Sequence, residues 1–140
     1  MTSQTHYEWN YRLRFQDADA AGILFYARLF DIFHDAYVCF LEELGRPLWK
    51  SIETSDTMIP LVHAEADYLS PLRFGDPIKV AIGVKRLGKK SFTLQYSVNR
   101  QEDGRMAATG ETVHVAVDRE NFQSVILPKG LQQALGRFHT

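Results

Sequence analysis

The segment Tyr26–Leu44, YARLFDIFHDAYVCFLEEL, shows the periodicity of a long amphipathic helix. Charged residues such as Arg28 and Asp35 lie opposite the apolar ones. Apolar side chains recur at spacings of three and four, at Tyr26, Leu29, Phe30, Phe33, Tyr37, Phe40, Leu41 and Leu44. This spacing predicts a helix of about five turns with one wide apolar face. Because Gly45 occupies a favoured helix C-cap position and Pro47 follows it, we expect the helix to end there.

Strands are predicted on both sides of this helix. Before it, polar and apolar side chains alternate strictly, which places Tyr7, Trp9, Tyr11, Leu13 and Phe15 on one buried face. After Thr57 the chain reads almost wholly as strands. These are an irregular strand over Ile59–Ser70, a hairpin of Ile78–Val84 and Phe92–Val98, a strand with Val113, Val115 and Val117 on one face, and a last strand over Phe122–Leu127. A short helix is expected after Pro128.

One helix and about five to six antiparallel strands predict an α+β fold, in which a curved antiparallel sheet wraps around the long helix. No linker, repeat or low-complexity segment divides residues 1–140, so we expect a single domain. Its 45% hydrophobic and 24% charged residues are typical of one globular core. A sheet covered by one helix leaves a face and its edge strands unprotected. A homo-oligomer, either a dimer or a tetramer, is therefore expected.

The overall composition argues against several classes of partner. The formal net charge of −1 disfavours a domain that binds nucleic acid through a general positive field. Charged or polar residues interrupt every apolar stretch well before about 18 residues, so no membrane span is expected. The start of the chain lacks a secretory signal, and the single Cys39 cannot form an internal disulfide. We therefore expect a cytoplasmic protein that binds neither nucleic acid nor membranes.

The near-neutral net charge conceals two segments of opposite charge. Eight acids lie between Asp31 and Asp67, against only Arg46 and Lys50. The segment from Pro77 to Gln101 contains no acidic residue. Its basic residues are Lys79, Lys85, Arg86, Lys89, Lys90 and Arg100. This basic segment is a first indication of an anionic ligand. A solvated hairpin edge protected by lysines explains it equally well.

The segment Gln16–Gly22, QDADAAG, is the most suggestive place for chemistry because it joins a strand to the long helix. A carboxylate there would meet free backbone N–H groups and the positive end of the helix dipole, and could act as a nucleophile or a base. The same N–H groups could bind a developing oxyanion. An aspartate near a helix start is also a common cap, and Gly22 is ordinary in a turn.

Other chemistries have less support. An Asp-x-Asp pattern after a strand also occurs in phosphotransferases of the haloacid dehalogenase type, but those enzymes need a parallel sheet. The five histidines and one cysteine lack the spacing of a zinc site. There is no phosphate-binding glycine loop and no nucleophile elbow. Neither a metal nor a cofactor is therefore expected.

The run Phe15–Tyr26, FQDADAAGILFY, and Asp35-Ala36-Tyr37 in the helix resemble the signature of the 4-hydroxybenzoyl-CoA thioesterase family, which are hotdog-fold acyl-CoA hydrolases. The resemblance extends to the basic turn before Ser91 and covers essentially the whole chain. It implies a hotdog fold and an enzyme that hydrolyses an acyl-CoA to the free acid and CoA. A module that binds acyl-CoA or acyl carrier protein without catalysis is the alternative from another class.

The resemblance also implies roles for individual residues. Asp19 would be the catalytic carboxylate, either attacking the thioester carbonyl or activating a water. Asp17 would then be structural, and the backbone N–H at Tyr26 would polarise the carbonyl. The CoA phosphates would contact Lys89 and Lys90, although Gly88 replaces a basic residue of the family and Arg86 could substitute for it. Further substrate contacts are expected at Gly22, Phe25, His63 and Ser91.

A narrower resemblance concerns the acyl group. The segment Ile59–Ala64, IPLVHA, with Tyr68 and Asp76 downstream, is similar to the 1,4-dihydroxy-2-naphthoyl-CoA hydrolases, in which this segment lines the acyl pocket from a neighbouring subunit. This favours an arylacyl substrate such as a dihydroxynaphthoyl or hydroxybenzoyl ester. Short- or medium-chain aliphatic acyl-CoA and acyl carrier protein esters remain alternatives. His63 is expected to contact substrate or to be a hydrogen-bonded structural residue.

Overall fold

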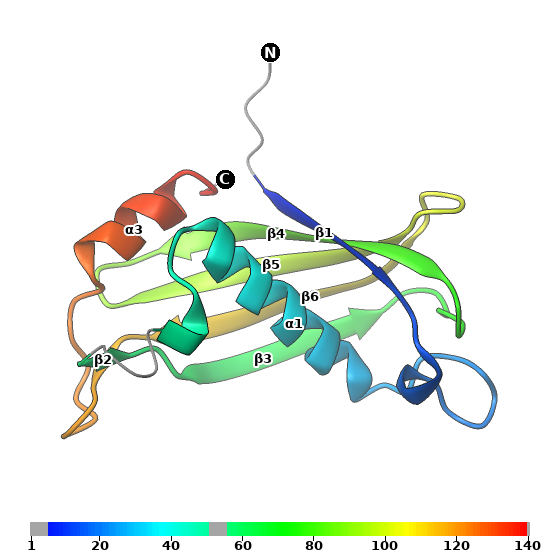
Figure 1. Ribbon diagram of the computed structural model, residues 1–140, viewed down its shortest axis with the longest axis horizontal. Helices are drawn as coiled ribbons and strands as arrows, with labels where there is room; N and C mark the ends of the chain where they lie inside the picture. The colour runs from blue at the N-terminus through cyan, green and yellow to red at the C-terminus, as the bar shows by residue number, and fades with distance from the viewer. Residues whose placement is uncertain (1–5, 51–55, 140) are drawn as a thin grey trace, which may run out of the picture.

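In the computed structural model, which describes residues 6–50 and 56–139, a curved sheet of five antiparallel strands wraps around one long helix, α1 (Figure 1). The strand order is β1-β4-β5-β6-β3. The bounds are Tyr7–Arg12 for β1, Arg28–Glu43 for α1, Leu61–Tyr68 for β3, Pro77–Leu87 for β4, Ser91–Arg100 for β5 and Met106–Val115 for β6. The predicted α+β arrangement is thus confirmed.

Smaller elements close the ends of the sheet. A 3-10 turn, η1 (Phe15–Asp17), follows β1, and the short strands β2 (Thr57–Met58) and β7 (Val117–Asp118) pair with each other. Helix α3 (Lys129–Gly136) follows Pro128, as predicted. Within residues 6–50 and 56–139, no helix is long and apolar enough to cross a membrane.

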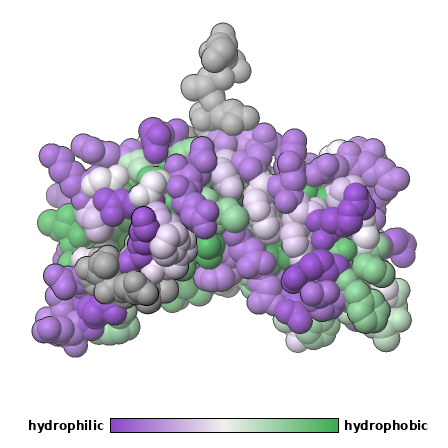
Figure 2. All heavy atoms as spheres, viewed as in Figure 1, coloured by the Kyte–Doolittle hydropathy of each residue, from purple (hydrophilic) through white to green (hydrophobic). Residues whose placement is uncertain are grey.

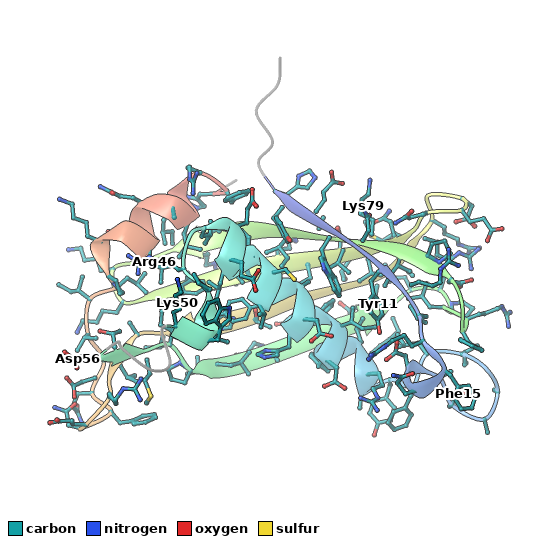
Figure 3. All side chains as sticks on the ribbon, in the orientation of Figure 1. Tyr11, Phe15, Arg46, Lys50, Asp56 and Lys79 are labelled. Carbon is teal, nitrogen blue, oxygen red and sulfur yellow. The ribbon has the colours of Figure 1, made fainter. Side chains whose placement is uncertain are left out.

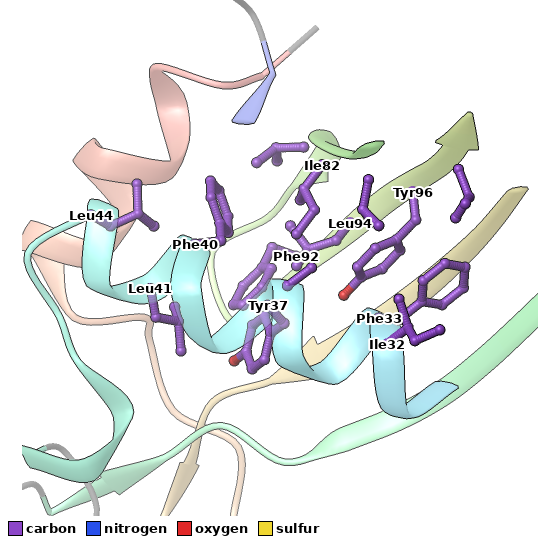
Figure 4. Close-up of a cluster of buried hydrophobic side chains, with 14 of the residues drawn as sticks. Ile32, Phe33, Tyr37, Phe40, Leu41, Leu44, Ile82, Phe92, Leu94 and Tyr96 are labelled. Atoms are coloured by element: carbon purple, nitrogen blue, oxygen red, sulfur yellow. The ribbon is translucent and has the colours of Figure 1, made fainter. Parts of the chain in front are cut away.

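The core lies between α1 and the concave face of the sheet (Figure 4). Alternate residues of β4 and β5 point at the helix and are fully buried, as the period of two predicts. Phe33 of α1 stacks on Tyr96 of β5, with ring centroids 4.4 Å apart. Each such side chain stabilises the fold by roughly 1.5–3 kcal/mol through removal of apolar surface from water.

Helix α1 ends as the sequence predicts. Gly45 adopts φ +78°, the left-handed conformation that a helix-terminating glycine takes readily. Its N–H donates to the carbonyl of Glu42 at 2.9 Å, and the N–H of Arg46 donates to the carbonyl of Leu41 at 2.8 Å. These two bonds satisfy carbonyls that the end of the helix would otherwise leave unpaired.

The prediction that Phe15 lies on the buried face is wrong. The first strand ends at Arg12, and the chain then turns into η1, so the alternation no longer corresponds to two faces of a strand. The Phe15 side chain is 76% exposed and makes an edge-on contact with Phe74, with ring centroids 5.7 Å apart (Figure 3).

The predicted strand Phe122–Leu127 is also absent. Phe122 adopts φ 61°, which turns the chain, and the segment forms an isolated bridge between Val117 and Ser124 and scattered backbone hydrogen bonds instead of a strand. On β6, Val113 and Val115 lie on the less buried outer face. Thr112 and His114 instead face the helix and are buried.

Candidate active site

Asp17 anchors the loop that joins β1 to α1. Its carboxylate is 1% exposed and accepts hydrogen bonds from the hydroxyl of Tyr11 at 2.6 Å and from the backbone N–H of Arg14 at 2.8 Å. Burial, together with the bond to Asp17, raises the pKa of Tyr11 to about 12, so this hydroxyl remains a donor at neutral pH. Loss of the Asp17 carboxylate would remove a charged acceptor from both donors, and a hydrogen bond to a charged group is worth roughly 1.5–3 kcal/mol. These contacts favour the structural role expected for Asp17.

Asp19 follows in the same loop, and its two carboxylate oxygens have different surroundings. Oδ1 accepts from the N–H of Ala21 at 2.9 Å and from the N–H of Ile23 at 3.3 Å. The Gly22 N–H closes the turn on the Asp19 carbonyl at 3.0 Å, and its φ of +81° is one that glycine adopts without strain. Oδ2 makes no hydrogen bond to any described residue. The loop therefore presents one oriented, exposed carboxylate oxygen for chemistry.

Unpaired backbone donors follow directly after this loop. The N-cap of α1 is Ala27 with no side-chain cap, so Asp19 does not cap the helix. The N–H groups of Tyr26 and Ala27 donate to no described residue, whereas those of Arg28 and Leu29 bond within the first turn. Tyr26 is held in place because its carbonyl accepts the hydroxyl of Tyr68 from β3. The positive end of α1 thus presents two N–H groups, without an acceptor in residues 6–50 and 56–139, to an anion or a developing oxyanion.

Exposed aromatic side chains surround the loop. Phe25 is 43% exposed and Tyr26 is 67% exposed, with their ring centroids 4.9 Å apart. Phe15 and Phe74 form a second exposed pair. Figure 2 shows hydrophobic atoms at lower right, over the end of the molecule where η1 and this loop lie in Figure 1. An exposed apolar cluster of this kind is typical of a binding surface.

The basic segment predicted from sequence narrows to the turn between β4 and β5. Three of its six bases pair with acids on neighbouring structure: Lys79 with Glu8, Lys85 with Glu111 and Arg100 with Asp103. Arg86, Lys89 and Lys90 are exposed and form no ion pair with a described residue. Ser91 is half-buried, and its carbonyl accepts the Gly88 N–H at 2.8 Å. Arg86 at the end of β4 and the two lysines of the turn can therefore receive an anionic group.

A single chain does not bring this turn to Asp19. The loop lies beside the start of β4, where the Leu13 N–H donates to the carbonyl of Asp76 at 3.0 Å. Lys89 and Lys90 follow the end of β4 at Leu87. Strand β4 has 11 residues, which separates the two features by roughly 30 Å. They therefore lie at opposite ends of the sheet, as Figure 1 shows.

His63 lies on the outer face of β3. It is directly opposite Val113, whereas its neighbour Ala64 pairs with Thr112 on the face that meets α1. His63 Nε2 is 3.0 Å from Glu65 Oε1, and both side chains are more than half exposed. Within one chain His63 thus has the hydrogen-bonded role that we considered, and its contact with substrate stays a prediction.

Sequence reasoning missed a cavity of about 260 Å³ between α1 and β3. It is lined by Phe30, Phe33, His34, Tyr37, Leu61, Ala64, Tyr96, Thr112 and His114. His114 is the least expected of these residues, because it is a buried titratable group. Burial lowers its pKa to about 4, and the backbone of Ile59 partly opposes this shift. The only local signal in the sequence is a histidine among the valines of a strand.

The buried His114 predicts a specific pH dependence of stability. Its ordinary pKa of 6.5 applies in the unfolded chain, so between pH 6.5 and about 4 the unfolded state gains a proton that the folded state excludes. The free energy of unfolding should be unaffected by His114 above pH 6.5 and should fall by about 3 kcal/mol by pH 4. Urea unfolding of wild type and His114→Gln at several pH values measures this difference. Parallel pH profiles for the two proteins would contradict it.

Comparison with known proteins places this geometry among thioesterases. The family model of the thioesterase-like superfamily matches residues 13–135. A 1,4-dihydroxy-2-naphthoyl-CoA hydrolase of Synechococcus elongatus is 32% identical over 130 residues, which cover 92% of this chain and 94% of the relative. A second hydrolase of that name, from Rippkaea orientalis, is 35% identical and covers 88% of this chain and 90% of its own.

A solved structure agrees. The structure of a gentisyl-coenzyme A thioesterase superposes with a TM-score of 0.82 at 30% identity and covers 92% of this chain and 99% of its own.

Proposed function

From the premise that this chain belongs to the thioesterase-like superfamily, has its hotdog fold and hydrolyses acyl-CoA thioesters, we propose that its substrate is an aromatic acyl-CoA ester. The products would be the free aromatic acid and CoA. One observation carries the proposal for the site: the free oxygen of Asp19 stands on a loop that leads straight to the unpaired N–H groups of Tyr26 and Ala27. Because the chain hydrolyses thioesters, the alternative of a module that binds acyl-CoA or acyl carrier protein without catalysis does not apply.

The proposed reaction uses these groups together. The thioester carbonyl oxygen accepts the N–H of Tyr26, so the positive end of α1 stabilises the negative charge that develops on it. The free oxygen of Asp19 either attacks the carbonyl carbon or takes a proton from a water that attacks it. In the first case CoA leaves as the thiolate, and water hydrolyses the resulting anhydride. In the second the tetrahedral intermediate expels the thiolate directly.

Two observations support an aromatic acyl group. The named relatives act on dihydroxynaphthoyl and gentisyl esters, both of which carry an aromatic ring. The cavity beside α1 presents the rings of Phe30, Phe33 and Tyr37, which match a flat apolar group.

The proposed site is completed by a second copy of the chain. Strand β3 is an exposed edge, where Leu61 and Val62 are each more than half exposed, as is Leu69 directly after the strand. Leu61 lies at the basic-turn end of the sheet and Tyr68 at the Asp19 end. Antiparallel pairing of two β3 strands would place these ends side by side and bring the basic turn of one copy to the Asp19 loop of the other. A tetramer and a cytoplasmic location stay predictions.

A panel of esters tests the proposed substrate. Thiol release, followed with a thiol-reactive dye, is measured with hydroxynaphthoyl-, hydroxybenzoyl-, hexanoyl- and decanoyl-CoA. We expect kcat/KM for the better aromatic ester to exceed that for both aliphatic esters by about tenfold or more, because the rigid rings lining the cavity favour a flat ligand. A preference for an aliphatic ester would replace the proposed acyl group. Saturable binding of every ester without thiol release would contradict hydrolysis itself.

A further inference from the structure

Three polar side chains form a buried hydrogen-bonded chain on the sheet side of the cavity beside α1. The Tyr96 hydroxyl lies 2.9 Å from Thr112 Oγ1, which lies 3.0 Å from His114 Nε2. These residues are at most 5% exposed. The His114 ring is stacked between Tyr37 and Phe92, with centroids 4.6 and 5.0 Å away. Burying polar side chains in an apolar core is costly unless their hydrogen bonds are satisfied. A donor or acceptor position of these three residues that is not yet used therefore indicates which group a ligand must supply.

The cavity is placed to receive the acyl group of a bound thioester. Phe30 lies four residues beyond Tyr26, a rise of about 6 Å along a helix. A ring attached to a carbonyl at the Tyr26 N–H therefore reaches the cavity. The exposed Leu61 and Ala64 of β3 line its mouth, on the side that the proposed second copy would cover. A cavity of about 150 Å³ holds benzene, so the 260 Å³ observed here is large enough for two fused rings.

Which side chain donates each of these two hydrogen bonds follows from the position of the proton on His114. His114 is uncharged at neutral pH and therefore carries one ring proton. Nδ1 makes no hydrogen bond of good geometry to a described residue, and the backbone of Ile59 favours a proton on the ring. We assign the proton to Nδ1, which leaves Nε2 to accept from Thr112 and Thr112 to accept from Tyr96. The proton of Tyr96 is then committed to Thr112, so its oxygen can only accept from a ligand.

We propose, resting on the function proposed above, that Tyr96 is the specificity-determining residue of this cavity, because its oxygen accepts a hydrogen bond from a ring hydroxyl of the aromatic acyl group. Thr112 and His114 are positioning residues, because they fix the Tyr96 proton away from the ligand. A ring that carries hydrogen or a methoxy group at the same place supplies no donor. The Tyr96 oxygen would keep its bond to Thr112, but its buried accepting position would receive no donor, which disfavours such substrates.

The test compares three CoA esters that differ at one ring position: hydroxynaphthoyl-, methoxynaphthoyl- and naphthoyl-CoA, with the hydroxyl tried at each position of the ring. For the best isomer, wild type should prefer the hydroxylated ester over both others by about tenfold or more in kcat/KM. Tyr96→Phe and Thr112→Val should bring this ratio close to one. Thr112→Ser keeps the hydroxyl and should keep the ratio. Thr109→Val makes the same change on the outer face of β6 and is the matched control.

The ratio separates a positioning role from a merely structural one, since loss of stability alone lowers the rate for all three esters together. A wild-type ratio near one for every isomer would overturn the proposal. An unchanged preference for the hydroxylated ester in Tyr96→Phe would also overturn it. Tyr96→Phe removes only one oxygen atom, so this variant gives the answer even if Thr112→Val does not fold. In both cases the thioesterase function would stand, because the esters are still cleaved. Absence of thiol release from all three esters would overturn the proposed aromatic substrate as well.

Discussion

Asp19→Asn should lower kcat for an aromatic acyl-CoA ester by about 10³-fold or more, because an amide can neither attack the thioester carbon nor accept a proton from water. The asparagine side chain retains an oxygen that can accept the N–H groups of Ala21 and Ile23, so the loop should keep its shape. Thiol release gives the rate, and thermal unfolding tests whether the fold is intact. An unchanged melting temperature with a lost rate is the expected combination.

The matched control makes the same chemical change at another exposed aspartate. Asp31 lies on the first turn of α1 and pairs with Arg28 at 2.9 Å, a surface ion pair that contributes at most about 1 kcal/mol. Asp31→Asn should therefore retain nearly the wild-type rate. If Asp19→Asn were as active as this control, the carboxylate would have no part in hydrolysis.

Replacing both Lys89 and Lys90 by Ala should raise KM for acyl-CoA esters by about 10- to 100-fold. Each phosphate contact of a lysine is a charge-assisted hydrogen bond worth roughly 1.5–3 kcal/mol, of which solvent exposure removes a part. A truncated pantetheine thioester lacks the nucleotide phosphates, and its KM should hardly change. Initial rates over a range of both substrates measure the two KM values.

Lys85→Ala is the control for this pair, because Lys85 lies on the same hairpin but is engaged by Glu111. It should change the KM of either substrate only slightly. Equal increases in KM for the CoA ester and the pantetheine ester in the double variant would show that the phosphates bind elsewhere.

The sequence predicts the elements of this fold where one local pattern decides them. Helix α1 follows from its apolar spacing and from Gly45, which ends it. The hairpin of β4 and β5 follows from two alternating runs. Prediction fails where alternation continues without a strand. At Phe15 the chain has already left the sheet, and at Phe122 a left-handed turn is followed by an isolated bridge instead of a strand.

The site is less accessible to sequence reasoning because its determinants come from distant segments. The resemblance implies different roles for Asp17 and Asp19, but only the fold shows the bonds from Tyr11 and Arg14 that bury Asp17. The basic segment likewise contains six cations, and only the folded chain shows that three of them pair with Glu8, Glu111 and Asp103. No spacing in the chain joins Tyr96 to Thr112, because strand pairing alone makes them neighbours.

The central claim is that Asp19 of one copy acts on an ester whose phosphates are held by the basic turn of another. The most direct test uses two variants, the inactive Asp19→Asn and the double variant Lys89→Ala, Lys90→Ala. They are mixed, unfolded and refolded together, so that their subunits exchange. In a one-to-one mixture about half of the dimers are hybrids, and each hybrid holds one site with both parts intact. At a substrate concentration where each variant alone is inactive, the account predicts recovery of about a quarter of the wild-type rate. A mixture no more active than its components would contradict it.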